Sequence, residues 1–230
     1  MKQHQRLQPC RPWIQKVCPS PRRYIQQLAR ELGCRRGVDV GCGTNSPLSA
    51  LRGTGVWCVG VDGSKASLEE ARSRSLFDEY ICADIREWLT SQVEKGQRWD
   101  VLVASHVIEH LEREDGEKLL RLAEKLGVRL LYIETPYGFV EPAYEPDGSD
   151  ELARHRSGWF PWDFASRGYS VFGMGLRGLR GSRGAPLLRS EFLTRSLERG
   201  LQYLCYRRPH SASTIAAIRC VDEVGRLRVL

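Results

Sequence analysis

Two glycines one residue apart, at the end of an apolar run, constrain this chain of 230 residues more than any other feature. The run Gly37–Val40 leads into Gly41 and Gly43, and turn-forming polar residues follow. Without a Cβ atom, both glycines let the backbone turn tightly and approach a ligand. About twenty residues further on, a second apolar run, Val59–Val61, ends in Asp62. The pattern predicts two adjacent strands that frame a nucleoside, with Asp62 accepting hydrogen bonds from both ribose hydroxyls.

Ser46 narrows the class of ligand. A dinucleotide-binding fingerprint has a third glycine at this position, where a helix packs closely and meets a pyrophosphate. The serine at this position therefore disfavours a dinucleotide-dependent oxidoreductase. S-adenosylmethionine (AdoMet) carries no phosphate and needs no such helix terminus. The stretch from Gly37 to Asn45 resembles motif I of the class I AdoMet-dependent methyltransferases, in which an acid, here Asp39, precedes Gly-x-Gly.

Three later segments resemble motifs of the same family, in the family's order. Trp99–Leu111 resembles the fourth strand with its following loop, and Leu130–Pro136 resembles the fifth strand. Tyr80–Ile85 is similar to the third strand, and the resemblance places Asp84 on the adenine amino group and Ile85 against the ring. The alternative for Asp84 is a helix cap, and the two roles are compatible.

The resemblance, closest to methyltransferases of types 11 and 23, implies AdoMet as the cofactor. It covers roughly residues 20–220 and is specific only for residues 37–136. Gly63 would supply its amide beside Asp62, and Ser105 would contribute backbone near the methionine moiety. The implied cofactor-binding residues are Asp39, Gly41, Gly43, Asp62, Gly63, Asp84, Ile85 and Ser105.

From residue 37 to residue 134, apolar runs alternate with amphipathic segments, which predicts an α/β fold with a parallel sheet and helices on both faces. We expect strands near 37–41, 57–61, 79–82, 99–104 and 128–134, and helices near 46–52, 64–74, 86–95 and 112–126. A helix near 161–167, a strand near 169–174, a helix near 187–204 and a strand near 214–221 follow. The resemblance implies a doubly wound, seven-stranded sheet in the order 3-2-1-4-5-7-6, with strand 7 antiparallel.

The expected organisation is one domain with additions. Residues 1–36 form an arm and a helix, and in this family such a helix often covers the cofactor. Residues 37–230 form the methyltransferase domain. Within it, residues 135–160 are rich in proline and aromatic residues and follow the fifth strand at its carboxyl end, which predicts a substrate lid. Residues 175–213 are expected to form an Arg-rich insertion between strands 6 and 7.

The segment His106–His110 matches the H-x-x-E-H pattern of some zinc peptidases, but that pattern requires a long helix rather than a strand end. Some quinone-biosynthesis O-methyltransferases resemble this loop and carry Glu at the first position of a magnesium site. Here His106 takes that position, and imidazole suits zinc better than magnesium, so we expect no metal. In the family, the residues at the positions of Glu109 and His110 more often have a structural role. His106 is then a candidate proton acceptor that faces the acceptor molecule.

His155 is the second candidate for a catalytic base. It lies in an H-x-S-G-W pattern that resembles small-molecule methyltransferases among uncharacterised bacterial and archaeal enzymes. A structural histidine that bonds loop backbone is an equal alternative. Tyr137, Tyr144 and Trp159 are candidate contacts of the acceptor, and for Tyr137 and Tyr144 the alternative is that they pack the lid.

Basic segments flank an acidic centre. Residues 1–36 hold nine basic residues and one acid, and residues 177–208 hold eight arginines and two glutamates, whereas residues 37–176 carry a net charge of −8. Arginine suits phosphate and carboxylate groups. We therefore expect methyl transfer to an O or N atom of a small, anionic or glycan-like acceptor. An RNA methyltransferase and a non-catalytic AdoMet-binding protein are the alternatives, although no N/D-P-P-Y motif is present.

The eight cysteines are scattered and form no C-x-x-C pair. The first residues lack an apolar signal core, and no apolar run approaches the roughly 18 residues of a membrane span. We expect a cytoplasmic protein with reduced thiols and no membrane span, and the sequence leaves the oligomeric state open.

Overall fold

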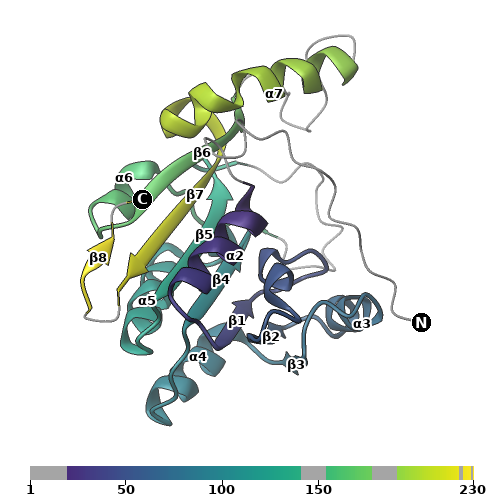
Figure 1. Cartoon of the computed structure of the whole chain (residues 1–230), viewed down its shortest axis with the longest axis vertical. Helices are drawn as coiled ribbons and strands as arrows, with labels where there is room; N and C mark the ends of the chain where they lie inside the picture. Colours follow the sequence, from purple (N-terminus) through teal and green to yellow (C-terminus); the bar gives the residue numbers. More distant parts are fainter. Residues whose placement is uncertain (1–19, 141–153, 178–190, 223–224, 229) are drawn as a thin grey trace.

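The computed structural model describes residues 20–140, 154–177, 191–222, 225–228 and 230 (Figure 1). The described strands are β1 (Arg36–Val40), β2 (Trp57–Asp62), β3 (Glu79–Cys82), β4 (Val101–Ser105), β5 (Leu130–Pro136), β6 (Ser170–Leu176), β7 (Ala212–Val221) and β8 (Leu227–Arg228). They form one sheet in the order β3-β2-β1-β4-β5-β7-β6, and β8 pairs with β7. β1 to β5 pair in parallel, and β7 is antiparallel to β5 and β6. The expected strand order is confirmed, and the short β8 is an addition to it.

The described helices are α2 (Pro21–Glu31), α3 (Lys65–Ser73), α4 (Ile85–Glu94), α5 (Arg113–Lys125), α6 (Pro161–Ala165) and α7 (Glu191–Arg207). Short 3-10 turns occur at η1 (Pro47–Leu51), η2 (Ile108–His110) and η4 (Pro209–Ser211). The expected α-helix at 46–52 is wrong, because η1 occupies that segment. The cause is local: Ser46 caps the turn, and Gly53, two residues beyond its end, has a φ of +75°.

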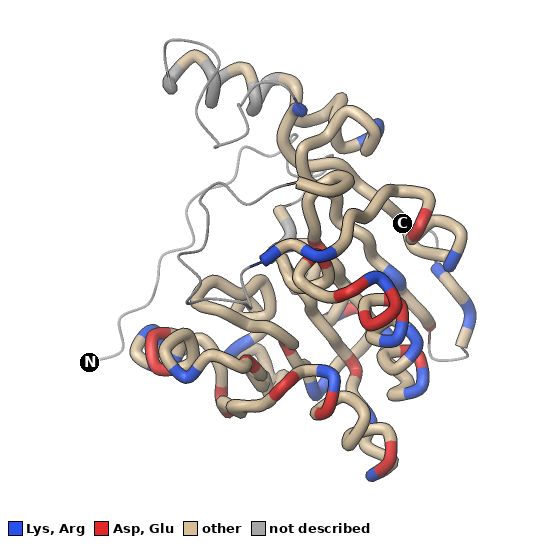
Figure 2. The backbone as a smooth tube through the Cα atoms, turned by 180° about the vertical axis from the view of Figure 1, so that it is seen from behind, with Lys and Arg blue, Asp and Glu red and all other residues tan. Residues whose placement is uncertain are grey.

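The sheet separates two apolar cores, as expected for helices on both faces. Leu89 of α4, Leu120 of α5 and Phe164 of α6 belong to one core, and Leu28 of α2 and Leu48 of η1 belong to the other. Successive residues of β4 and β5 alternate between the two cores. The outer surfaces of α3, α4 and α5 carry acidic and basic residues side by side (Figure 2).

The last helix lies beyond one end of the sheet, at the top of Figure 1, where it packs on β6. Tyr206 of α7 is buried and stacks on Phe172 of β6, with ring centroids 4.6 Å apart. The expected Arg-rich insertion contains α7 and η4, and residues 178–190 lie outside the described residues. None of the described helices is long and apolar enough to cross a bilayer.

Two stretches of the expected lid lie side by side. Gly138 N donates to the carbonyl oxygen of Trp159 at 2.7 Å, and Tyr137 also forms a β-bridge to Trp159. We call residues 154–160 the strap. Residues 141–153, which include Tyr144, lie outside the described residues.

Candidate functional site

The glycine turn after β1 is held against the end of β2. Gly41 N donates to the carbonyl oxygen of Val61 at 2.7 Å, and Gly43 N donates to Asp62 Oδ2 at 2.9 Å. Asp62 Oδ1 accepts from Ser64 N at 2.8 Å. A carboxylate offers about four acceptor positions. Asp62 therefore fixes the turn and keeps capacity for the ribose hydroxyls that the sequence predicts.

Gly41 also joins this turn to the loop after β4. Its φ is +70°, and a Cβ atom there would lie 2.5 Å from Cγ2 of Val107. Such a contact is far inside van der Waals distance, so only glycine lets the two loops meet. The glycine turn, which is expected to bind the nucleoside, is thus adjacent to the loop after β4, which is expected to lie near the methionine moiety.

Asp39 lies beneath the turn and is 1% exposed. Ser46 Oγ donates to Asp39 Oδ2, whereas Oδ1 is buried without a hydrogen-bond partner among the described residues. Burial raises the pKa of Asp39 to about 8, against the lowering effect of the Ser46 hydrogen bond.

Replacing Asp39 by asparagine should remove a pH dependence of stability. The carboxyl pKa is about 3.9 in an unfolded chain and about 8 in the fold. Between these values the folded state binds more protons than the unfolded state, so the stability of the wild type falls as pH rises. The free energy of unfolding of both proteins is measured in urea between about pH 5 and pH 8. As the pH rises, the difference between them should shift in favour of Asp39→Asn. Parallel pH curves would contradict a neutral buried carboxyl.

Asp84 caps α4. Its Oδ1 accepts from Arg86 N at 2.8 Å, and Oδ2 lies 2.6 Å from the Arg86 guanidinium. The Arg86 hydrogen bonds hold the pKa of Asp84 below its usual value. The capping role is satisfied by this geometry. The adenine contacts of Asp84 and Ile85 stay predictions, as does the amide contact of the exposed Gly63.

A hydrogen-bonded group joins the carboxyl ends of β4 and β5. His106 adopts a φ of +56°, which places its Nδ1 3.1 Å from Glu109 Oε1 and its Nε2 3.5 Å from Glu134 Oε1. Tyr132 Oη and Ser105 Oγ donate to Glu134 Oε2 at 2.8 Å and 3.3 Å. Ser105 therefore stands where the two strands end, and its expected backbone contact with the cofactor stays a prediction.

His106 is charged in this arrangement. Hydrogen bonds to Glu109 and Glu134 raise its pKa to about 10, because both carboxylates stabilise the imidazolium. Burial by itself would raise the pKa of Glu134, but His106 holds it below the usual value. A ring that already carries both protons has no lone pair to accept another. The geometry therefore disfavours His106 as the proton acceptor.

The strap is tied to η2. Arg156 N and Ser157 N donate to the carbonyl oxygen of Glu109 at 2.7 Å and 3.1 Å, and Trp159 Nε1 donates to that of Ile108 at 3.3 Å. Trp159 is completely buried. Its expected role as an acceptor contact is corrected by this burial, because the ring packs beneath the strap and cannot touch a ligand.

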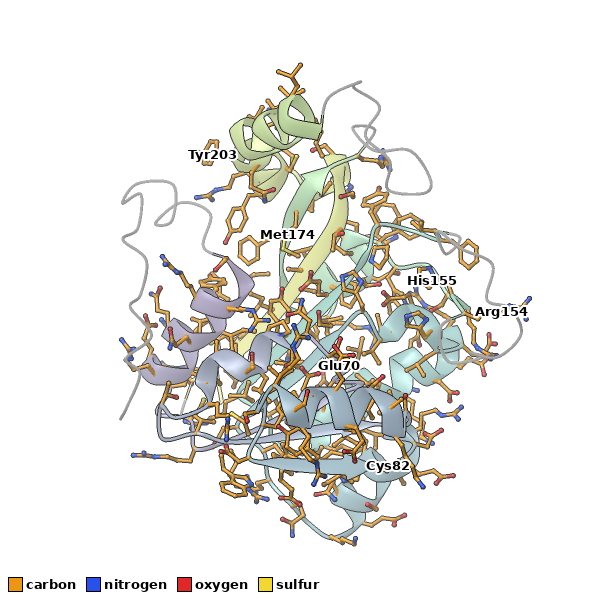
Figure 3. All side chains as sticks on the ribbon, turned by 90° about the vertical axis from the view of Figure 1, so that its right-hand side faces the viewer. Glu70, Cys82, Arg154, His155, Met174 and Tyr203 are labelled. Atoms are coloured by element: carbon orange, nitrogen blue, oxygen red, sulfur yellow. The ribbon has the colours of Figure 1, made fainter. Side chains whose placement is uncertain are left out.

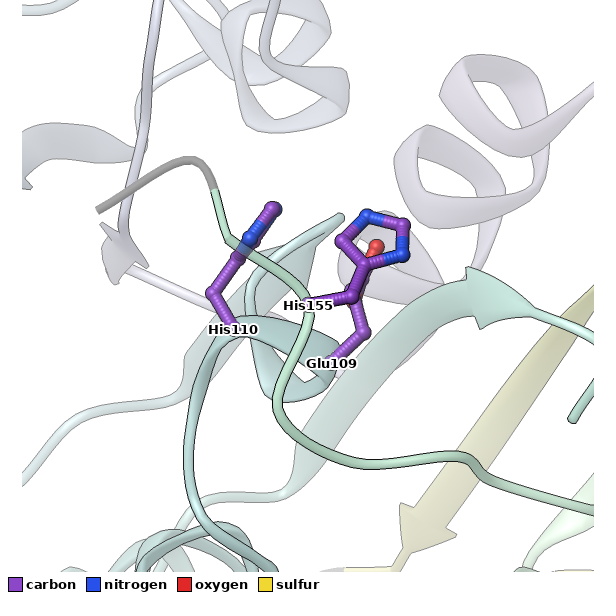
Figure 4. Close-up of side chains that lie close together, drawn as sticks. All are labelled: Glu109, His110 and His155. Atoms are coloured by element: carbon purple, nitrogen blue, oxygen red, sulfur yellow. The ribbon is translucent and has the colours of Figure 1, made fainter. Parts of the chain in front are cut away.

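The strap brings His155 to Glu109 and His110 (Figure 4). A ring nitrogen of each histidine and a carboxylate oxygen of Glu109 lie within 4.8 Å of one another. His155 Nδ1 faces the carbonyl oxygen of Val140, as the structural alternative expects, so Nε2 is its remaining nitrogen. Figure 3 shows His155 and Arg154 together on one side of the molecule.

A row of rings begins at the residue after β5. Phe160 stacks on Trp162 with centroids 4.6 Å apart, and Trp162 stacks on His210 at 5.9 Å. Tyr137 meets Phe160 edge-on at 5.4 Å, and the Arg177 guanidinium lies 4.6 Å from the Tyr137 ring centroid. We call these five residues the aromatic platform. Trp162 is 53% exposed although Phe160 and His210 both stack on it, so part of the indole remains accessible to a ring-shaped ligand.

Sequence reasoning missed several of these residues. Glu134 is an acid at the carboxyl end of a parallel strand, a position where open α/β sheets bind ligands, and this signal could have found it. Phe160, Trp162 and His210 had no comparable signal, because the fold alone brings their segments together.

The sequence is similar to known methyltransferases. A family model described as a methyltransferase domain matches residues 38–126. The chain is 30% identical over 103 residues to the ubiquinone biosynthesis O-methyltransferase of Histophilus somni, covering 43% of either chain. It is 29% identical over 114 residues to that of Proteus mirabilis, covering 49% of this chain and 46% of the relative. The matches span less than half the length of these curated relatives.

Solved structures share the fold. A SAM-dependent methyltransferase from Archaeoglobus fulgidus is similar with a TM-score of 0.53 at 21% identity, over 89% of this chain and 96% of that chain. The plantazolicin methyltransferase BpumL, in complex with SAH, has a TM-score of 0.51 at 14% identity, over 94% and 84% of the two chains. The matched domain, the strand order and the glycine turn agree: residues 38–126 match a methyltransferase domain, and together these findings support a class I AdoMet-dependent methyltransferase with AdoMet as its cofactor.

Proposed function

We propose that this protein transfers the methyl group of AdoMet to a hydroxyl oxygen of a small, ring-bearing acceptor that is anionic or glycan-like. The observation that carries the proposal is the aromatic platform, which begins where β5 ends and leaves Trp162 open to solvent. The curated relatives are named O-methyltransferases, which favours oxygen over nitrogen as the methylated atom.

The cofactor would lie between the glycine turn and α2. Arg22 of α2 donates to the side chains of Asn45 and Ser49, and Gln26 donates to the carbonyl oxygen of Ala50 at 3.2 Å. These contacts hold α2 on the segment that follows the glycine turn. They support the expected role of the N-terminal helix as a cover of the cofactor.

Methyl transfer requires few catalytic side chains. The acceptor oxygen attacks the methyl carbon, the sulfur leaves as the thioether of SAH, and the oxygen gives its proton to water. Most of the rate enhancement comes from holding the oxygen about 3 Å from the methyl carbon in line with the leaving sulfur. On the proposed platform, the exposed part of Trp162 would contact the acceptor ring, and Arg177 would attract a carboxylate or phosphate.

Replacing Trp162 by alanine should raise the KM for the acceptor about fivefold, because an aromatic pair contributes about 1 kcal/mol beyond its buried area. The affinity for S-adenosylhomocysteine (SAH) should not change. Purified protein is given labelled AdoMet with panels of anionic ring metabolites, sugar nucleotides and short RNAs, and label transfer is measured. Phe139→Ala is the matched control, because Phe139 is 58% exposed and lies outside the platform.

Three results would count against the proposal. An unchanged KM in Trp162→Ala would remove the platform from the acceptor site. Transfer to RNA alone would favour the RNA methyltransferase alternative. SAH binding without transfer to any acceptor would favour a non-catalytic AdoMet-binding protein.

A further inference from the structure

Three ionisable side chains meet at the carboxyl ends of β4 and β5. The ring of His106 lies between two carboxylates, with Nδ1 3.1 Å from Glu109 Oε1 and Nε2 3.5 Å from Glu134 Oε1. These contacts raise the pKa of His106 to about 10, so the ring is charged at neutral pH. We call His106, Glu109 and Glu134 the charged triad. One imidazolium between two carboxylates gives the triad a net charge of −1.

The charged triad is held firmly in place. Glu134 Oε2 accepts hydrogen bonds from Tyr132 Oη at 2.8 Å and from Ser105 Oγ at 3.3 Å. The Glu109 side chain is 2% exposed and that of Glu134 is 16% exposed. Carboxylates shielded from water in this way are screened by salt less than surface charges are. Beyond the short distances that separate its own charges, the triad therefore acts as a fixed negative charge.

The backbone of His106 is unusual. Its φ of +56° lies in the left-handed region, which residues with a Cβ atom rarely adopt. His106 N also donates to the carbonyl oxygen of Glu134 at 2.8 Å, so main chain and side chain together join this residue to β5. Backbone outliers of this kind persist only where their surroundings hold them, and they cluster at ligand sites. The conformation points to a role for the triad beyond packing.

The charged triad borders the expected position of the methionine moiety of the cofactor. Val107, the residue after His106, lies against Gly41 of the glycine turn, where an added Cβ would be 2.5 Å from Val107 Cγ2. On the other side, Ser105 is the register partner of Glu134 in the pairing of β4 with β5. The resemblance to the family implies that Ser105 lies near the methionine moiety, and in AdoMet that moiety carries the sulfonium.

AdoMet and SAH differ by one methyl group and one charge. The sulfur of AdoMet is a cationic sulfonium, whereas that of SAH is a neutral thioether. A fixed charge near the sulfur therefore acts on one ligand and not on the other. We propose that the charged triad makes this site prefer AdoMet to SAH, because its net negative charge attracts the sulfonium. After methyl transfer this attraction is lost, so the triad favours the replacement of SAH by AdoMet.

The inference rests on AdoMet as the cofactor and is independent of the proposed acceptor. The binding of AdoMet analogues and of SAH can be measured without an acceptor. A triad that does not discriminate between the ligands would leave the proposed methyl transfer standing. Failure to find a ring-bearing acceptor would refute the proposed function and leave the role of the triad standing.

The test compares SAH with sinefungin, an AdoMet analogue that carries an ammonium group in place of the methylated sulfur and cannot donate a methyl group. Calorimetric titration of the full chain with each ligand gives the ratio of the two affinities. Glu134→Gln removes one negative charge and keeps an oxygen that can accept from Tyr132 and Ser105. The preference for sinefungin over SAH should fall roughly tenfold in this variant. Glu109→Gln neutralises the other carboxylate and should lower the ratio in the same direction, which provides the test if Glu134→Gln does not fold.

Two control variants separate an effect of charge from an effect of disruption. His106→Gln breaks the same contacts but removes a positive charge, so the ratio should not fall. Glu79→Gln removes a carboxylate from the exposed start of β3, at the other end of the sheet, and should leave the ratio unchanged. Near-ultraviolet circular dichroism checks the fold of each variant. An unchanged ratio in Glu134→Gln, an equal loss of affinity for both ligands, or an equal fall of the ratio in His106→Gln would overturn the proposal.

Discussion

The Trp159→Ala variant is expected to lose about 3–5 kcal/mol of unfolding free energy, the usual effect of deleting a large buried aromatic ring. Trp159 is completely buried, and its Nε1 donates to Ser157 Oγ at 2.9 Å. The Arg113 guanidinium lies 3.9 Å from its ring centroid, and Phe164 packs at 5.4 Å. The variant would leave a cavity beneath the strap, and the Ser157 hydroxyl, which donates to the carbonyl oxygen of Ile108 at 3.1 Å, would lose the donor that it accepts from.

Trp162→Ala provides the matched control for this stability measurement. The two tryptophans are three residues apart, but Trp162 is 53% exposed, so its loss should change the free energy of unfolding by much less. Urea unfolding of the wild type and both variants under one condition gives the comparison. Similar losses in the two variants would mean that Trp159 does not anchor the strap.

The difference between the two tryptophans shows where sequence reasoning reaches its limit. Trp159 was expected to contact the acceptor because it lies in an aromatic loop at the carboxyl end of the sheet. The space for its ring is made by Gly116 of α5, where an added Cβ would lie 2.5 Å from Trp159 Cζ2. A glycine inside a helix is unfavourable by about 1 kcal/mol relative to alanine, which packing against this ring offsets. No pattern in one sequence pairs residues so far apart.

The cofactor half of the site was more predictable than the acceptor half. The contact of Gly43 with Asp62 follows from two adjacent parallel strands, which hydrophobic patterning and the glycine spacing already indicate. The state of His106 does not follow from its neighbours in the sequence. It depends on a left-handed backbone at His106 and on Glu134 of the next strand, both of which are tertiary features.

Asp62→Ala is expected to weaken SAH binding by about 1–3 kcal/mol, or roughly 5- to 150-fold in affinity, because charge-assisted hydrogen bonds to the ligand are lost. The structure adds a second cause. Both oxygens of Asp62 accept backbone N–H groups, from Gly43 and from Ser64, so the variant also frees the glycine turn. Asp62→Asn keeps one acceptor oxygen and should fall between the wild type and Asp62→Ala in calorimetric titration with SAH.

Asp78→Ala separates the loss of ligand contacts from a general loss of stability. Asp78 Oδ2 accepts from Cys58 N at 2.9 Å, near the other end of β2, where no cofactor contact is expected. Its removal should lower the free energy of unfolding about as much as removal of Asp62, because each variant leaves backbone donors of β2 or its flanking turns without their carboxylate. SAH affinity should fall only in the Asp62 variants. Equal SAH affinity in Asp62→Ala and Asp78→Ala would show that Asp62 organises the turn without touching the cofactor, and the ribose would then require another acceptor.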